Sequence, residues 1–133
     1  MAEANDSPLL FIATGTGVAP IRAQIWDLLA KKHQRKMTLV FGCGDVGQLL
    51  FQKEWEELTA RNKNLKVISV CEKSGDGWHG ATGLVTKIIP ALIKNLPSHQ
   101  IYVCGNPEMV KAMVAVLKTN GVSAEKIHTE GYA

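Results

Sequence analysis

A chain of 133 residues is one domain's worth of sequence and is long enough to bury a hydrophobic core of its own. Its formal net charge of +3 is small, and no basic run is interleaved with aromatic residues, so nucleic acid is not expected as a partner. Residues 1–7 form an N-terminal tail without the cationic region of a secretory signal, and the apolar run Leu9–Ala13 is too short to cross a membrane. These features predict a cytoplasmic protein with no membrane span.

The three cysteines, Cys43, Cys71 and Cys104, are widely spaced in the sequence, and no Cys-x-x-Cys occurs. A zinc or iron–sulfur site built from this chain is therefore not expected. An odd and sparse cysteine count is typical of reduced thiols in the cytosol.

Apolar runs of strand length alternate with amphipathic helical stretches, which is the pattern of a parallel sheet covered by helices on both faces. We therefore predict an α/β fold, a doubly wound parallel sheet in a domain of residues 8–133. The five expected strands are Leu9–Ala13, Met37–Phe41, Val67–Val70, Ile101–Cys104 and Ile127–Thr129.

The first two helices are expected at Ala19–Lys32 and Gly47–Arg61. Helical spacing places apolar residues of each on one buried stripe. The basic end of the first helix is interpreted as a solvated terminus rather than a binding patch. The predicted buried residues are Ile21, Ile25, Leu28 and Leu29 in the first helix, and Phe51, Trp55 and Leu58 in the second.

The third helix is expected between Leu84 and Asn95, with Pro90 causing a kink or dividing it into two short helices. The fourth has the best-defined ends: Asn106 caps it, Pro107 is its first residue, and Gly121 follows its end. Its predicted buried stripe is Met109, Met113, Val116 and Leu117.

A glycine-rich turn, Thr14–Pro20, joins the first strand to the first helix. Such a turn lets backbone N–H groups approach a pyrophosphate at a helix N-terminus, and glycine is needed because a Cβ would block that approach. A side chain at Gly17 is therefore expected to abolish ligand binding while leaving the fold intact. The pattern G-x-G-x-x-P differs from the dinucleotide fingerprint and lacks the lysine of a P-loop. A tight turn with no ligand remains the alternative.

A second glycine turn, Cys104–Met109, follows the fourth strand. Ligands of open α/β sheets bind outside the carboxyl ends of the strands, where the strand order reverses. If the first and fourth strands are neighbours, the two turns flank one crevice. The alternative for Cys104 is an inert core cysteine.

Two further loops carry polar and glycine residues, Gly42–Asp45 after the second strand and the stretch from Cys71-Glu72 to Gly83 after the third. His79 has no acid–base partner near it in sequence and is interpreted as a surface residue. The chain offers no Ser-His-Asp or Cys-His arrangement and no paired metal ligands.

Taken in order, these motifs resemble the pyridine-nucleotide half of the ferredoxin–NADP reductase family over nearly the whole chain, from Pro8 to Tyr132. The motifs that carry the resemblance are GTGVAP, FGCGD with LLFQKEW, GWHGATGLV, YVCGNPEM and IHTEGY. The resemblance implies a five-stranded sheet with strand order 3-2-1-4-5.

The resemblance also implies site residues. The glycine turn would hold the pyrophosphate, Cys104 would lie beside the nicotinamide, and the turn after it would line the adenosine side. Tyr132, in an acid–x–aromatic ending, would cover the flavin until nicotinamide displaces it. The predicted cofactor-binding residues are Gly15, Thr16, Gly17, Val18, Ala19, Pro20, Gly42, Gly44, Asp45, Glu72, Gly105, Asn106, Pro107 and Met109; the predicted catalytic residues are Cys104, Glu130 and Tyr132; no metal ligand is predicted.

Two departures from the family pattern shape the prediction. The Arg-x-Tyr-Ser/Thr motif of the flavin-binding domain has no counterpart here, so FAD or FMN is expected on a domain absent from this chain, supplied in cis or in trans. Members that bind NADPH often carry Ser-Arg after the third strand and an arginine after the second. Here Cys71-Glu72 and Gly44-Asp45 take these places, which favours NADH over NADPH.

The predicted function is hydride transfer from NADH (or NADPH) to a flavin bound by another domain, which passes electrons to an iron–sulfur protein, a haem protein or an oxygenase. One alternative is a regulatory module that senses NAD(H) without catalysing a reaction. Such a sensor would not need the acid–x–aromatic ending of Glu130 and Tyr132. Another is a domain of flavodoxin-like topology that binds a different phosphate ligand.

Overall fold

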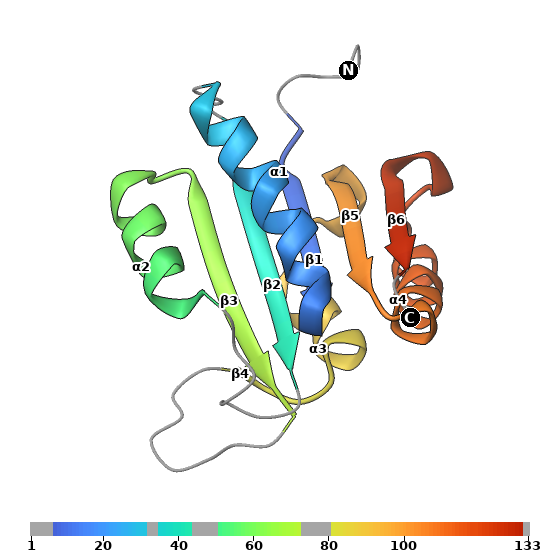
Figure 1. Ribbon diagram of the computed structural model, residues 1–133. Helices are drawn as coiled ribbons and strands as arrows, with labels where there is room; N and C mark the ends of the chain where they lie inside the picture. Colours follow the sequence, from blue (N-terminus) through green and yellow to red (C-terminus); the bar gives the residue numbers. More distant parts are fainter. Residues whose placement is uncertain (1–6, 32–34, 44–50, 73–80, 132–133) are drawn as a thin grey trace.

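The structure is a computed structural model that describes residues 7–31, 35–43, 51–72 and 81–131. Its centre is an all-parallel sheet with the strand order β4-β3-β2-β1-β5-β6 (Figure 1). The five longer strands are β1 (Leu9–Thr14), β2 (Met37–Cys43), β3 (Leu65–Cys71), β5 (Gln100–Gly105) and β6 (Ile127–Gly131).

These five strands stand in the order 3-2-1-4-5 when numbered along the chain, so the predicted fold class and strand order are confirmed. The sixth strand, β4 (Ala81–Thr82), pairs in parallel with Val70 and Cys71 at the edge of the sheet. Sequence patterns did not predict it because two residues are too few to show an alternation of apolar and polar side chains.

Helices cover both faces of the sheet. They are α1 (Val18–Ala30), α2 (Gln52–Arg61), α3 (Val85–Leu92) and α4 (Pro107–Thr119). Figure 1 shows α1 crossing in front of the sheet, with α3 and α4 behind it.

The central strand β1 contributes side chains to the hydrophobic core on both faces of the sheet. Residues Leu9–Ala13 are all at most 2% exposed, because a parallel strand with helices on both faces has no solvent side. Successive side chains point to opposite faces. Leu9, Phe11 and Ala13 therefore pack with residues of α1 and α2, while Leu10 and Ile12 pack with residues of α3 and α4.

Two of the predicted helices need correction at their starts. The first begins one residue earlier than predicted. Its predicted buried residues Ile21 and Ile25 are buried, but Leu28 and Leu29 are only partly buried. In the second, Trp55 and Leu58 are buried as predicted, but the prediction for Phe51 was wrong because this ring is 38% exposed. Phe51 has a left-handed backbone, with φ of 61°, and precedes the first residue of α2, so it does not continue the helical stripe.

The third helix runs unbroken from Val85 past Pro90 to Leu92, where Ile93 becomes extended. The alternative of two short helices before Asn95 is therefore wrong, and a 3-10 turn follows at Leu96–Ser98. Pro90 has no N–H to donate to the carbonyl of Thr86, so this short helix lacks that one hydrogen bond.

The fourth helix has the ends that the sequence predicts. The backbone N–H of Met109 donates a 2.8 Å hydrogen bond to Asn106 Oδ1, and Pro107 is the first helical residue. Gly121 follows the end with φ of +87°, a conformation that glycine adopts at little cost. Met113 and Leu117 are buried as predicted, but the third buried residue is Val110, whereas Met109 and Val116 are only partly buried.

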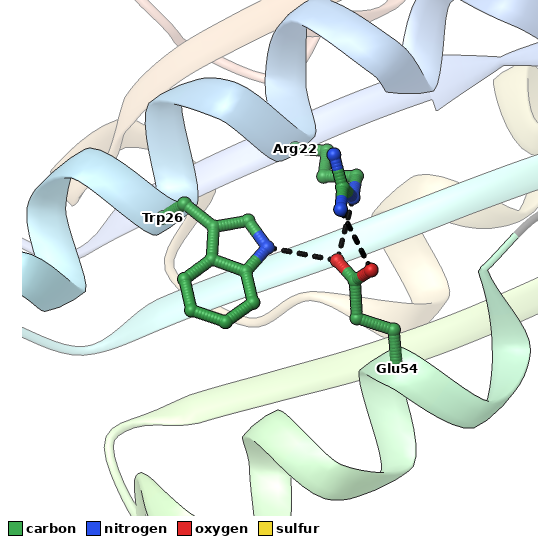
Figure 2. A network of polar contacts seen from close by, with 3 residues as sticks. All are labelled: Arg22, Trp26 and Glu54. Atoms are coloured by element: carbon green, nitrogen blue, oxygen red, sulfur yellow. Dashed lines mark hydrogen bonds and ion pairs between the residues drawn. The ribbon is translucent and has the colours of Figure 1, made fainter.

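An ion pair between partly exposed side chains joins α1 to α2 (Figure 2). The guanidinium of Arg22 donates two hydrogen bonds to Glu54, of 2.5 and 2.8 Å, and the indole N–H of Trp26 donates a third, of 2.8 Å. The same guanidinium lies 4.6 Å from the centre of the Phe51 ring. The hydrogen bond from Arg22 lowers the pKa of the Glu54 carboxyl, against a smaller opposing effect of desolvation.

Replacing Glu54 with Gln is expected to remove a small, pH-dependent part of the free energy of unfolding. Because the pKa of Glu54 is lowered in the folded state, the pair stabilises the fold above the pKa of the unfolded chain, about 4.3, and this contribution disappears as the pH falls through the lowered folded value. Urea denaturation of both proteins between pH 7 and pH 3 measures the difference. The effect is small because the pair is partly exposed to solvent.

The matched control for this prediction is Asp27→Asn, which breaks the more exposed ion pair between Asp27 and Lys31. It should leave stability nearly unchanged across the same pH range. A Glu54→Gln difference that persists undiminished at pH 3 would contradict the electrostatic origin.

Candidate functional site

The two glycine turns lie side by side at the carboxyl edge of the sheet. Strands β1 and β5 are neighbours, with Ala13 opposite Cys104. The chain leaves β1 toward β2 on one side, while β5 and β6 extend the sheet on the other, so the strand order reverses here. The structure thus meets the condition under which both turns flank one ligand crevice.

Gly17 is a glycine because the turn crosses directly over the end of β5. It is buried, and a Cβ at this position would lie 2.7 Å from the carbonyl carbon of Cys104 and 2.8 Å from the nitrogen of Gly105. No side chain fits against a backbone at that distance. The expectation that a side chain at Gly17 would leave the fold intact is therefore wrong, since it would first collide with β5.

Gly15 has the opposite surroundings. Its φ is +54°, and a Cβ there would meet nothing within 4 Å. The turn Gly15–Gly17 leads directly into α1, and Gly17 offers no side chain to cap the first N–H groups of the helix. Open space beside a helix N-terminus suits an anion such as a pyrophosphate.

A buried hydroxyl lies at the end of β1, where the glycine turn begins. Thr14 Oγ1 has no hydrogen-bond partner among the residues that the structure describes. A Cβ on Gly105 would lie 2.5 Å from this oxygen and 2.5 Å from Met109 Cε. Gly105 is therefore packed between the side chains of Thr14 and Met109. A buried hydroxyl usually has a partner, so a ligand or a water molecule is expected to supply one here.

An open cavity of about 190 Å³ lies beside this crevice, between the start of α1 and the strands β5 and β6. It brings together three predicted site residues, Pro20, Cys104 and Glu130, and the last two are directly opposite each other in the sheet. The remaining lining residues are Ile21, Gln24, Tyr102, Val103, His128 and Thr129.

None of these six further lining residues was predicted as a site residue from the sequence. Tyr102 and His128 are paired across β5 and β6, and their rings stack with centroids 4.6 Å apart. Gln24 lies one helical turn after Pro20, on the same side of α1. The available signal was the period-2 alternation, which puts Tyr102 on the same face as Cys104.

The thiol of Cys104 is neutral at physiological pH. Its side chain is 2% exposed, and burial, together with the nearby Glu130 carboxylate, raises the pKa of the thiol to about 11. A protonated thiol is a poor nucleophile. This position therefore suits contact with a ligand rather than covalent catalysis.

The remaining predicted residues are distributed over other elements. Asn106 and Pro107 are exposed at the start of α4. Gly42 is buried, and a Cβ there would lie 3.2 Å from Thr14 Cγ2 and 3.3 Å from Val85 Cβ, so packing accounts for the glycine. Glu72 is exposed at the end of β3, three strands away from β5. Gly44, Asp45, His79 and Tyr132 lie outside the described residues.

In the turn itself, Val18 is buried against the sheet, Ala19 is exposed and Pro20 is partly buried, while Thr16 contributes its backbone to the 3-10 turn. Within the described ranges, no three His, Cys, Asp or Glu side chains are grouped so that they could hold a metal ion. None of the helices described is both long and apolar enough to cross a membrane.

The sequence matches the family described as "Oxidoreductase NAD-binding domain" over residues 11–115. One subunit of the Na(+)-translocating NADH-quinone reductase from Methylococcus capsulatus is 34% identical, in an alignment that covers 98% of this chain and 34% of the relative. The chain thus spans about a third of the length of the curated relatives that it matches.

Solved structures share the fold. The cytochrome P450 reductase GcoB from Amycolatopsis gives a TM-score of 0.84 at 23% identity, covering 97% of this chain and 38% of that one. The flavohem-like FAD/NAD binding domain of nitric oxide dioxygenase from Vibrio cholerae O1 biovar El Tor also gives 0.84 at 23% identity, covering 99% and 53%.

Replacing Gly17 with Ala is expected to lower the free energy of unfolding by about 3 kcal/mol, because the added Cβ overlaps the backbone of β5. Gly15→Asn is the matched control in the same turn. Asn tolerates a left-handed backbone, and its Cβ would point into open space, so the cost should stay below about 1 kcal/mol. Urea denaturation measures both, and a Gly17→Ala protein as stable as the wild type would contradict the close approach.

Proposed function

We propose that this chain, which belongs to the oxidoreductase NAD-binding domain family, binds a nicotinamide dinucleotide across the carboxyl edge of β1 and β5 and presents it to a flavin on another domain. One observation carries the proposal. The glycine turn, which has open space beside Gly15, lies next to the cavity lined by Cys104 and Glu130, and both are at the point where the strand order reverses. The coenzyme supplies the hydride when it is bound.

The pyrophosphate end of the proposed site uses the backbone. The turn Gly15–Gly17 exposes the start of α1, where N–H groups and the helix dipole favour negative charge. The Thr14 hydroxyl, buried at the end of β1 without a partner among the described residues, is available to donate a hydrogen bond to a ligand or a water molecule. The close contact of Gly17 with β5 keeps this turn fixed before any ligand arrives.

The nicotinamide end uses the side chains of the cavity. The neutral thiol of Cys104 can pack against an uncharged ring without the repulsion or reactivity of a thiolate. Glu130, directly opposite Cys104, gives this end a negative charge that suits the cationic oxidised ring. Neither residue needs to accept a proton, because hydride transfer requires only that the donor and acceptor atoms be held within about 3.5 Å.

The adenosine end is proposed to lie along the start of α4, where Asn106 and Pro107 are exposed. The capping bond to Met109 occupies Asn106 Oδ1, so the amide nitrogen of Asn106 is the group that can donate to a ligand. Glu72, exposed at the end of β3, is proposed to face the ribose together with Asp45.

The flavin, FAD or FMN, is proposed to be held by a domain outside these 133 residues, in cis or in trans. Support comes from the relatives, since the chain spans about a third of one component of an NADH-quinone reductase and about half of a domain described as binding both FAD and NAD. Electrons would pass from that flavin to a further acceptor. Tyr132, which follows β6 in the sequence, is proposed to cover the flavin until nicotinamide displaces it.

Replacing Cys104 with Ala is expected to slow flavin reduction by NADH about 10- to 100-fold when a flavin-binding domain is supplied. The substitution empties space beside the nicotinamide and loosens the hydride geometry, but it leaves the glycine turn intact, so NADH affinity should change little. Stopped-flow absorbance of the flavin measures the rate, and calorimetry measures the affinity. The matched control is Cys71→Ala on β3, outside the cavity, which should keep the wild-type rate.

The chain by itself should neither bind flavin nor oxidise NADH. Flavin absorbance bands in the purified chain, or rapid dye reduction by NADH without a flavin domain, would contradict the proposal. With the flavin domain present, Tyr132→Ala should tighten nicotinamide binding, because the ring that competes for the same place is gone.

NADH is expected to bind at least tenfold more tightly than NADPH. One carboxylate about 6 Å from one phosphate charge costs about 3 kcal/mol at an effective dielectric constant of 20, before salt screening. Replacing Glu72 with Gln should therefore narrow the difference in Kd mainly by improving NADPH binding. Glu125→Gln, an exposed carboxylate just before the start of β6 at the opposite edge of the sheet, is the control for a general change of charge. Tighter binding of NADPH by the wild type would refute the preference.

A further inference from the structure

Two cysteines that are far apart in the sequence are in contact at the carboxyl edge of the sheet. Cys43 is the last residue of β2, Cys71 is the last residue of β3, and the two are directly opposite each other in the parallel pairing. Their Sγ atoms are 3.1 Å apart. We propose that Cys43 and Cys71 form a redox-active dithiol, a modification site that a small disulfide such as oxidised glutathione converts to an intramolecular disulfide.

The backbone already has the spacing that this bond needs. Neighbouring strands lie about 4.8 Å apart, within the range of about 4.4–6.8 Å between the Cα atoms of disulfides. The N–H of Glu72 donates a 3.0 Å hydrogen bond to the carbonyl of Cys43, so the two strand ends are held together at this point. Closing the sulfur–sulfur distance by about 1 Å therefore requires small side-chain rotations rather than a movement of the strands.

The two cysteines differ in their exposure. Cys43 is 8% exposed, whereas Cys71 is fully buried. In the proposed reaction the small disulfide therefore reacts with Cys43 first, and Cys71 then reacts with the Cys43 sulfur, which is 3.1 Å away. The third cysteine, Cys104, lies on β5 with β1 between it and β2, so it is not placed to compete for either sulfur.

The proposed reaction is thiol–disulfide exchange, in which oxidised glutathione is the oxidant. The Cys43 thiolate attacks one sulfur of oxidised glutathione, which forms a mixed disulfide and releases one glutathione thiolate. Cys71 then attacks the Cys43 sulfur, forms the Cys43–Cys71 bond and releases the second glutathione. Two protein thiols lose two electrons and two protons, and one glutathione disulfide becomes two glutathione thiols.

The test treats the reduced, folded 133-residue chain with oxidised glutathione, quenches it by alkylation, and measures intact mass and non-reduced peptides. The expected product has lost the mass of two hydrogen atoms and contains one cross-link, between the peptides of Cys43 and Cys71. Cys104→Ser should form the same product. Cys43→Ser and Cys71→Ser should not form it, and Cys71→Ser should instead retain glutathione on Cys43.

The proposal is overturned if the wild-type chain stays unmodified, if glutathione remains on Cys43 without resolution, or if the cross-link involves Cys104. Thermal unfolding adds a second readout. Because the bond joins residues 28 positions apart in strands that are already paired, oxidation should raise Tm by roughly 10 °C. A Tm that falls on oxidation would contradict the claim that the native strands accommodate the bond.

Discussion

The close approach of Gly17 to the backbone of Cys104 and Gly105 is the contact on which the candidate site depends. It fixes the first turn of α1 against the end of β5, although the two segments are far apart in the sequence. Pro20 thereby comes to lie over the same cavity as Cys104 and Glu130. A larger residue at position 17 would separate the helix start from the strand, and the two halves of the site would no longer face each other.

Around this contact, the sheet provides a rigid support because its central strand is buried on both faces. Large apolar side chains fill the two layers on either side of β1, from Phe11 and Phe41 on one face to Ile12 and Met113 on the other. The two glycine turns continue directly from the ends of the buried strands β1 and β5. They use glycine, with exposed N–H groups on the ligand side at Gly15 and close packing on the protein side at Gly17 and Gly105.

Much of this architecture was predictable because it rests on local signals. Apolar runs gave the five longer strands, and Asn106, Pro107 and Gly121 gave both ends of α4. The family resemblance gave the strand order. These features depend on the residues of one segment or on a pattern repeated along the chain.

The features that the sequence missed depend on contacts between distant segments. Phe51 leaves its helix stripe because its own backbone is left-handed and its ring packs beside Arg22. The reason for glycine at position 17 is a strand about 90 residues away, not the ligand alone. Likewise, the contact between Cys43 and Cys71 follows from strand register, which no spacing in the sequence reveals.

The central claim is that a nicotinamide dinucleotide binds between the ends of β1 and β5. The most direct measurement is the change in backbone amide chemical shifts when isotope-labelled chain is titrated with NADH. The account predicts that the largest changes occur at Gly15, Gly17 and Gly105, with smaller ones along the start of α4. Changes confined to the opposite edge of the sheet, at the strand starts Leu9, Met37 and Gln100, would contradict it.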